Sequence, residues 1–174
     1  MRANIVLTLT GPDRIGVVEE ATRVLLGLEG NIENSRMVHL GGEFAILALV
    51  SLPEVHIVAL ERAFAQMVGQ GYKLTVTATE KAEPVAAAQY RIEVEGADHE
   101  GIINGIARAI SQLGISIETM DTATSEAPVS GAPLFSMNAL VAVPRDLTGP
   151  DWRAELSAAA ADADVDLSIT AVGE

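Results

Sequence analysis

The chain has 174 residues, 49% of them hydrophobic, and a formal net charge of −13 with only 11 Lys and Arg. So negative a chain is repelled by phosphate backbones and anionic lipids, which argues against direct nucleic-acid binding and against membrane binding. It contains no cysteine, and this excludes disulfides, thiolate nucleophiles and thiolate metal ligands.

The first half of the chain alternates between strand and helix periodicity. The apolar spacing predicts strands at 3–10, 31–39, 43–51 and 73–79, and helices at 15–28 and from Pro53 to Gly69. Gly41 and Gly42 lie between two strand patterns, which is typical of a tight hairpin. The predicted order is βαββαβ.

The second half repeats this order. It predicts strands near 89–95, 115–122, 134–143 and 166–172, and helices near 100–113 and 150–162. Thr148 or Gly149 is expected to cap the last helix, with Pro150 in its first turn. About six residues are inserted within Thr122–Pro133, whose composition favours a hairpin loop. We therefore expect one unit over 1–80, a linker over 81–88 and a second unit over 89–174.

Both units carry Gly-x-Asp-x-x-Gly between the first strand and the first helix, at Gly11–Gly16 and at Gly96–Gly101. Apolar residues on both sides of the motif correspond at a constant offset of 85. The matched pairs are Ile5, Leu7, Leu9, Val17, Val18, Ala21, Leu25 and Leu28 with Tyr90, Ile92, Val94, Ile102, Ile103, Ile106, Ile110 and Leu113. Such a duplication predicts two similar sites, or two halves of a shared one.

The first motif has chemistry that suits a small zwitterion. A helix start with a nearby glycine attracts a carboxylate, and Asp13 is expected to cap the helix while offering a negative group for an ammonium. Arg14 has a fork of donors that fits a carboxylate. Fifteen residues beyond Gly16, Asn31 can donate to a carboxylate and accept from an ammonium. The alternative interpretation is a turn with a cap, and Asn31 as an ordinary turn residue.

These residues resemble the ACT domain, a βαββαβ module that binds amino acids and serves as a regulatory sensor. The resemblance rests on LTLTGPDRIGVV, on Gly30-Asn31-Ile32 and on the strand FAILALVSLP. It implies an α+β fold of two tandem ferredoxin-like units, each an antiparallel sheet with helices on one face. A pair of units with nothing appended is most similar to the glycine cleavage system transcriptional repressor group, whose members act through protein contact and respond to glycine.

In ACT domains the ligand lies between neighbouring units, at the turn after strand one and at the start of strand two. The resemblance therefore implies a ligand site at Asp13, Arg14, Ile15, Gly16, Asn31 and Ile32, with second-unit counterparts Asp98, His99, Gly101 and Ser116. The second motif departs from the first, because Arg14-Ile15 becomes His99-Glu100 and Asn31 becomes Ser116. Either only the first unit keeps an amino-acid site, or the second unit binds differently.

Three functions remain open at this point. The leading one is an amino-acid-responsive regulator for glycine or serine, acting as a homodimer on a protein partner such as a LysR-type transcription activator. The others are a ligand-independent adaptor and a detached regulatory subunit of an amino-acid biosynthetic enzyme. The sequence has no phosphate loop, nucleophile elbow or His cluster at ligand spacing. We expect no enzyme activity, no cofactor, no metal site and a cytoplasmic location without a membrane segment.

Overall fold

The computed structural model describes residues 1–79, 87–128, 130–145, 147 and 151–173. The chain divides into two compact units, unit 1 over residues 1–83 and unit 2 over residues 84–174. Most of the predicted linker, 81–88, lies outside the described residues. Its last two residues, Ala87 and Ala88, are the first residues of a strand.

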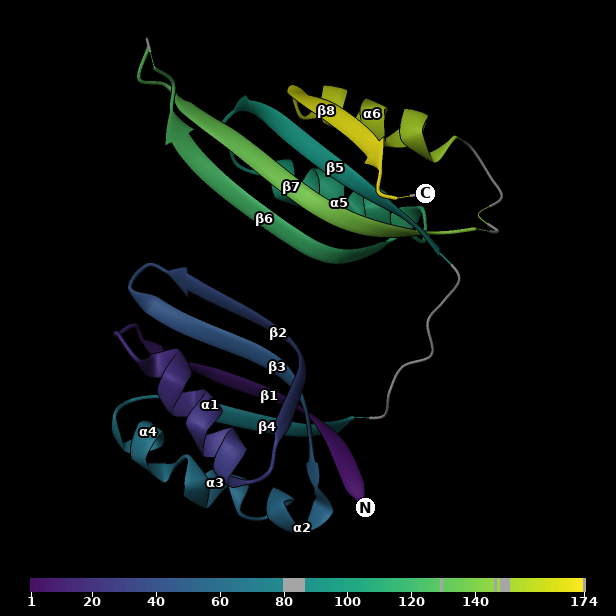
Figure 1. The fold of residues 1–174 in the computed structure, drawn as a ribbon. Helices are drawn as coiled ribbons and strands as arrows, with labels where there is room; N and C mark the ends of the chain where they lie inside the picture. The colour runs from purple at the N-terminus through teal and green to yellow at the C-terminus, as the bar shows by residue number, and fades with distance from the viewer. Residues whose placement is uncertain (80–86, 129, 146, 148–150, 174) are drawn as a thin grey trace. The chain divides into compact units, whose positions relative to one another are not determined.

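Unit 1 is a four-stranded antiparallel sheet with helices on one face (Figure 1). Its elements are β1 (Arg2–Pro12), α1 (Val17–Gly27), β2 (Asn31–Leu40), β3 (Glu43–Pro53), α2 (Glu54–Ile57), α3 (Leu60–Ala63), α4 (Ala65–Gly69) and β4 (Lys73–Thr79). The strand order is β2-β3-β1-β4. The predicted strands and the first helix are present, within a few residues of the expected bounds.

Unit 2 has the same layout with a continuous second helix. Its elements are β5 (Ala87–Ala97), α5 (Ile102–Gln112), β6 (Ser116–Glu126), β7 (Pro133–Pro144), α6 (Trp152–Asp162) and β8 (Val165–Ala171). The strand order is β6-β7-β5-β8. The predicted α+β class, two tandem ferredoxin-like units with antiparallel sheets, is therefore confirmed.

Each unit has its own apolar core between the sheet and its helices. Alternate residues of the first strand face the helices, and the repeat pairs predicted from the offset of 85 supply much of both cores. Buried members are Ile5, Leu7, Leu9, Val17, Ala21 and Leu25 in unit 1, and Ile92, Val94, Ile102, Ile106 and Ile110 in unit 2. Val18 and Ile103 are exceptions, since they are 39% and 43% exposed.

The second helix of unit 1 is broken into α2, α3 and α4, whereas one helix from Pro53 to Gly69 was expected. Val55 and Val58 are β-branched, which lowers helix propensity, and they are 75% and 89% exposed. Core packing therefore does not compensate for the poor propensity at these positions. Leu60 and Phe64 still reach the core, as their spacing predicts.

Two expectations for unit 2 are corrected. The last helix is capped by Asp151, whose Oδ1 accepts a hydrogen bond from the Arg153 N–H at 3.0 Å; residues 148–150, expected to supply the cap, lie outside the described residues. The loop expected over Thr122–Pro133 is shorter in the structure. Its first residues belong to β6, which continues to Glu126, and β7 begins at Pro133.

Candidate functional site

The turn between β1 and α1 is held by close backbone contacts. A Cβ atom on Gly11 would lie 2.7 Å from Cδ1 of Tyr72, so this position accepts only glycine without a shift. The Asp13 N–H donates to the Gly42 carbonyl at 3.0 Å, which joins the turn to the β2–β3 hairpin. Gly16 has a φ of 91° and is the N-cap residue of α1, a conformation that favours glycine. α1 has no side-chain cap, so the expected capping role of Asp13 is wrong.

The Asp13 carboxylate instead points toward β2. Its Oδ2 lies 3.7 Å from Nε2 of His39, and the Asp13 side chain keeps 37% of its exposure. This pair is not predictable from local pattern, because Asp13 and His39 belong to different elements of the chain. The result is a partly exposed carboxylate beside the start of α1.

Arg14 is occupied within unit 1. Its Nη2 forms an ion pair with Oε2 of Glu20 and donates to Oε1 of Gln70 at 2.8 Å. Its guanidinium also lies 5.7 Å from the centre of the Tyr72 ring. The hydrogen bond to Glu20 raises the pKa of Arg14 above its usual value. Arg14 therefore connects the turn to the loop before β4. Its Nη2 is engaged by Glu20 and Gln70 and does not point to a free ligand carboxylate, contrary to the prediction from the sequence.

The turn between β5 and α5 repeats this construction. A Cβ atom on Gly96 would lie 2.7 Å from Cγ1 of Val165, and Gly101, the N-cap of α5, has a φ of 97°. The Asp98 N–H donates to the Pro133 carbonyl at 3.0 Å. The Thr124 hydroxyl donates to Oδ2 of Asp98 at 3.4 Å. Thr124 is the repeat counterpart of His39, so both turns place an Asp beside the same position of the neighbouring strand.

His99 has the same structural role as Arg14, with different chemistry. Its Nδ1 lies 3.0 Å from the Glu100 carbonyl oxygen and its Nε2 lies 2.8 Å from that of Ala163. Carbonyl oxygens only accept, so both ring nitrogens can donate only in the imidazolium form. These bonds raise the pKa of His99, and the charges of Asp164 and Asp98 add to the effect. His99 thus ties its turn to the loop before β8.

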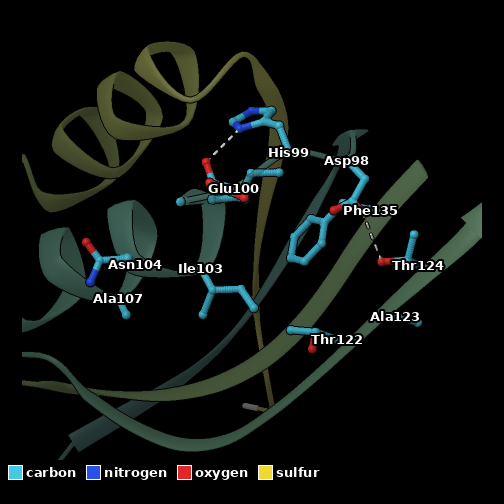
Figure 2. A pocket seen from close by; sticks show the side chains of 12 residues that line it. Asp98, His99, Glu100, Ile103, Asn104, Ala107, Thr122, Ala123, Thr124 and Phe135 are labelled. Atoms are coloured by element: carbon cyan, nitrogen blue, oxygen red, sulfur yellow. Dashed lines mark hydrogen bonds between the residues drawn. The ribbon is translucent and has the colours of Figure 1, made fainter. Parts of the chain in front are cut away.

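A concavity of about 640 Å³ opens beside the second turn. Figure 2 shows its lining side chains, with Phe135 on β7 and with Thr124, which is hydrogen-bonded to Asp98, on the neighbouring strand β6. Three of the predicted residues line it, namely Asp98, His99 and Gly101. The sequence missed Thr124 and Phe135, although the repeat offset links Thr124 to β2 of unit 1. Ser116 does not line this concavity.

In unit 1 a concavity of about 540 Å³ lies at the other end of the first helix. Asn31 and Ile32 line it together with Arg23 and Leu26 of α1. Just before Asn31, the Arg2 side chain donates to the Glu29 carbonyl at 3.0 Å. Arg2 also donates to the carbonyl and the hydroxyl of Ser51, at 2.6 and 3.0 Å, and so ties the turn before β2 to β3. Sequence reasoning did not identify Arg2.

Asp13 and Asn31 lie at opposite ends of unit 1. Asn31 pairs with Ser51, and Ser51 pairs with Asn4 on β1. Asn4 precedes Asp13 by nine positions, which is about 30 Å along an extended strand. In unit 2, Ser116 pairs with Ala142, and Ala142 pairs with Gln89 on β5. Gln89 precedes Asp98 by nine positions, so Ser116 is equally far from Asp98. Neither unit alone brings both halves of the expected site together.

The described residues also bear on metal and membrane binding. They contain no group of three or more His, Asp and Glu side chains placed to hold a metal ion. None of the helices in the described part of the chain has the length and apolar character needed to span a bilayer.

Comparison with known proteins identifies the family. The ACT domain model matches residues 3–76. An unknown protein from Galdieria sulphuraria, solved by crystallography, is 30% identical; the match covers 99% of this chain and 100% of that one, with a TM-score of 0.83. A crystal structure provisionally named as a glycine cleavage system transcriptional repressor is 21% identical over 100% of this chain and 99% of that one, with a TM-score of 0.72. No curated protein matches the chain.

The family match falls on unit 1, and unit 2 repeats its strand order, its turn and its glycine N-cap. The full-length likeness to the Galdieria protein extends over both units. The chain therefore belongs to the ACT domain family and carries two units of that fold in tandem.

Proposed function

We propose that this chain is an amino-acid-responsive regulatory protein that acts by protein contact. The proposed type is the glycine cleavage system transcriptional repressor, with glycine or another small amino acid such as serine as ligand. Membership of the ACT family and the full-length likeness to a protein provisionally given that name support this proposal. The proposed partner is a transcription activator of the LysR type, bound without direct nucleic-acid contact, in the cytoplasm.

The observation that carries the proposal is the open helix start beside an acidic side chain. A Cβ atom on Gly16 would meet no heavy atom within 4 Å, so the space beside this N-cap residue is open. The Val17 N–H donates to the Arg14 carbonyl at 3.3 Å, which leaves the N–H groups of Val18 and Glu19 as the first ones of α1 that a ligand can take. Such groups attract a carboxylate, and Asp13 offers the ammonium a negative partner. Ile15 is fully exposed next to them and supplies an apolar contact. These features together fit a small zwitterion.

The second half of the site comes from another unit in this proposal. β2 is an edge strand of its sheet, and edge strands pair readily with a second chain. An antiparallel pair of β2 strands about a twofold axis would set Asn31 of one chain level with Leu40 of the other. Leu40 pairs with Glu43 next to Gly42, which accepts the hydrogen bond from Asp13. A homodimer of this kind would bring Asn31 and Ile32 beside the partner's Asp13.

The size of the ligand limits its affinity. Glycine has about five heavy atoms, and at roughly −1.5 kcal/mol per atom it binds no more tightly than about micromolar. Binding in the micromolar to millimolar range suits a sensor of metabolite concentration. Ligand at 100 times its dissociation constant should add about 2.7 kcal/mol to the free energy of unfolding.

Thermal unfolding with each of the twenty amino acids tests the proposal. We expect glycine or serine to raise the melting temperature by several degrees. Asp13→Ala and Asn31→Ala should each abolish this response and leave the fold intact. Asn34→Ala, three positions along the same strand, is a matched control that should respond like the wild type. A response that survives in both site variants would place the ligand elsewhere.

Asp98→Ala and Ser116→Ala decide whether unit 2 also binds. Glu100 places a carboxylate at the rim of the unit 2 concavity, and this opposes a ligand carboxylate there. We therefore expect these two variants to keep most of the glycine response. A loss as large as that of Asp13→Ala would assign the ligand site to unit 2 instead.

A ligand-independent adaptor is the second candidate, and one observation favours it. Arg14 and His99, the two basic residues of the duplicated motif, are both engaged in contacts within their own units. An adaptor would show no stabilisation by any amino acid and would still capture its protein partner. Capture of a biosynthetic enzyme in the same experiment would support a detached regulatory subunit.

A further inference from the structure

Each sheet has one face covered by helices and one face without them, here called the open face. In unit 1, Thr8 lies between the buried Leu7 and Leu9 and therefore points to the open face. Directly paired residues share a face, so Thr8 is in a row with Leu47 and Arg36. The register thus assigns the residues of the open face strand by strand.

The open face of unit 1 has an apolar centre and two basic residues. Val38 and Leu47 on it are 53% and 51% exposed. Arg36 and Lys73 belong to the same rows, through the pairs Arg36 with Leu47 and Lys73 with Thr10. The rows from Asn4 to Thr10 contain no acidic residue, and the next row adds Glu43 at the β2–β3 hairpin. An exposed apolar centre with a basic rim is the composition of a protein interface.

The positive charges on this face have no acidic partner in the described residues. Arg36 bonds only to its own strand, at the side-chain oxygen of Asn34 and the carbonyl of Ser35. Neither Arg36 nor Lys73 forms an ion pair within the described part of the chain. This is unusual in a protein of net charge −13, and it leaves the face free to receive carboxylates.

The open face of unit 2 has the opposite charge. Its rows contain Glu93, Glu95, Asp121 and Asp166, with Arg91 as their basic residue. Asp121 and Asp166 correspond to the charged positions of unit 1, whereas Glu93 and Glu95 correspond to Thr8 and Thr10. Asp121 occupies the place of Arg36 in the repeat. Arg36 belongs to the row of Leu47 and Thr8, and Asp121 belongs to the equivalent row of Asn138 and Glu93. Asp166 pairs with Glu95 as Lys73 pairs with Thr10.

We propose that the open face of unit 1 binds the open face of unit 2 from a second copy of this chain. Pairing the unit 1 face with itself would set Arg36 and Lys73 against like charges, with Glu43 at the hairpin end as the acidic residue of its rows. Pairing the unit 2 face with itself would bring together an excess of carboxylates. The unlike pairing sets Arg36 and Lys73 against carboxylates, and the threonines of unit 1 can donate to those that remain. Two such contacts, related by a twofold axis, close a dimer. The proposal does not depend on any ligand.

Charge reversal on each face tests this interface. Arg36→Glu with Lys73→Glu makes the unit 1 face acidic, and Asp121→Arg with Asp166→Lys makes the unit 2 face basic. We expect the wild type to sediment at twice the 18.2 kDa of one chain. Each double variant should weaken the dimer at least about tenfold, because like charges then face each other. The quadruple variant should recover the dimer, because its two faces are again opposite in charge.

The control carries the same charge change on helices. Arg62 and Arg108 are exposed on α3 and α5, so Arg62→Glu with Arg108→Glu should leave the dimer unchanged. Circular dichroism of every variant separates loss of the dimer from loss of the fold. A wild type that stays monomeric at all concentrations overturns the proposal. So does a dimer that is insensitive to both reversals, or a quadruple variant no better than the double ones.

Discussion

Unit 1 and unit 2 hold the same turn in place with different chemistry. Arg14 in unit 1 forms an ion pair with Glu20, whose side chain is only 10% exposed, whereas His99 in unit 2 bonds two backbone carbonyls. Both side chains connect the turn after the first strand to the loop before the last one. Matched spacing in a repeat can thus preserve a structural contact, even where the residue type suggests a ligand contact.

The units also differ in charge. Residues 1–83 hold 7 Lys and Arg against 10 Asp and Glu, whereas residues 84–174 hold 4 against 14. Most of the net charge therefore belongs to unit 2, and its open face is part of that excess. The two helix starts do not simply follow this difference, because Glu19 and Glu20 lie in the first turn of α1, whereas the first turn of α5 has no acidic residue and Glu100 precedes its N-cap.

The largest expected effect comes from the glycine that precedes each motif Asp. Gly11→Ala should cost about 3 kcal/mol, because the new methyl meets both the ring and the Cα of Tyr72. Gly96→Ala should cost about 1–2 kcal/mol, since the nearest atom is a Val165 methyl. Urea unfolding measures both. Gly27→Ala, where the added methyl meets nothing, is the control, and an equal cost at Gly11 would contradict the packing described for unit 1.

The Arg14 ion pair should matter more than an ordinary surface pair. Among the described residues, Arg14→Ala leaves the mostly buried Glu20 with the hydrogen bond from Gln66 as its remaining side-chain partner. The Arg23–Glu19 pair, with side chains 64% and 69% exposed, is the matched control and should be worth about 0.3–0.5 kcal/mol. We expect Arg14→Ala to lower stability more than Arg23→Ala in denaturant unfolding. Arg14→Ala with Glu20→Ala should cost less than the two single variants together.

The cap of α6 has no counterpart in unit 1, whose second helical region has no side-chain caps in α2, α3 or α4. Asp151→Ala should cost about 1 kcal/mol in unit 2. The fluorescence of Trp152, the only tryptophan, reports this unfolding, because its ring is buried against Tyr90 at 5.0 Å between ring centres. Asp162→Ala at the other end of the same helix should be neutral or slightly stabilising. Equal losses at both positions would contradict a specific cap.

The smallest effect is a pH dependence confined to unit 2. The pKa of His99 is raised in the folded state, so its stabilising contribution is complete below about 6.5, the unfolded pKa. The contribution is lost as pH rises through the folded value. The free energy of unfolding of the wild type, followed by Trp152 fluorescence, should therefore fall relative to that of His99→Gln as pH rises from mildly acidic to mildly alkaline. Parallel curves would show that the His99 contacts do not depend on its charge.

Much of the fold follows from local pattern. The alternation of Lys73–Thr79 predicts β4 with its observed bounds. α1 begins two residues later than its apolar spacing predicts, because Gly16 takes a left-handed conformation. The partners of Arg14 could not be predicted, since Gln70 is 56 positions away and meets Arg14 only after the sheet has formed.

The separation of Asp13 from Asn31 was open to prediction from the sequence. The helix returns the chain to the end of the sheet where β1 begins, and β2 then runs in the same direction as β1, since both are antiparallel to β3. The second strand therefore begins level with the start of the first. The count of fifteen positions from Gly16 to Asn31 does not by itself reveal where Asn31 lies, because the helix between them carries the chain to the other end of the sheet. In the structure, Asn31 is level with Asn4, which means that a site using both residues needs two units.

The most direct test of a shared amino-acid site is complementation between two inactive chains. Asp13→Ala and Asn31→Ala are each purified alone and then as a mixed dimer, isolated through two different tags after co-expression. If the site is shared between chains, neither variant alone is stabilised by glycine, whereas the mixed dimer binds about half as much glycine as the wild type, because one of its two shared sites is intact. A mixed dimer that binds none, or a single variant that binds as the wild type does, would contradict a shared amino-acid site.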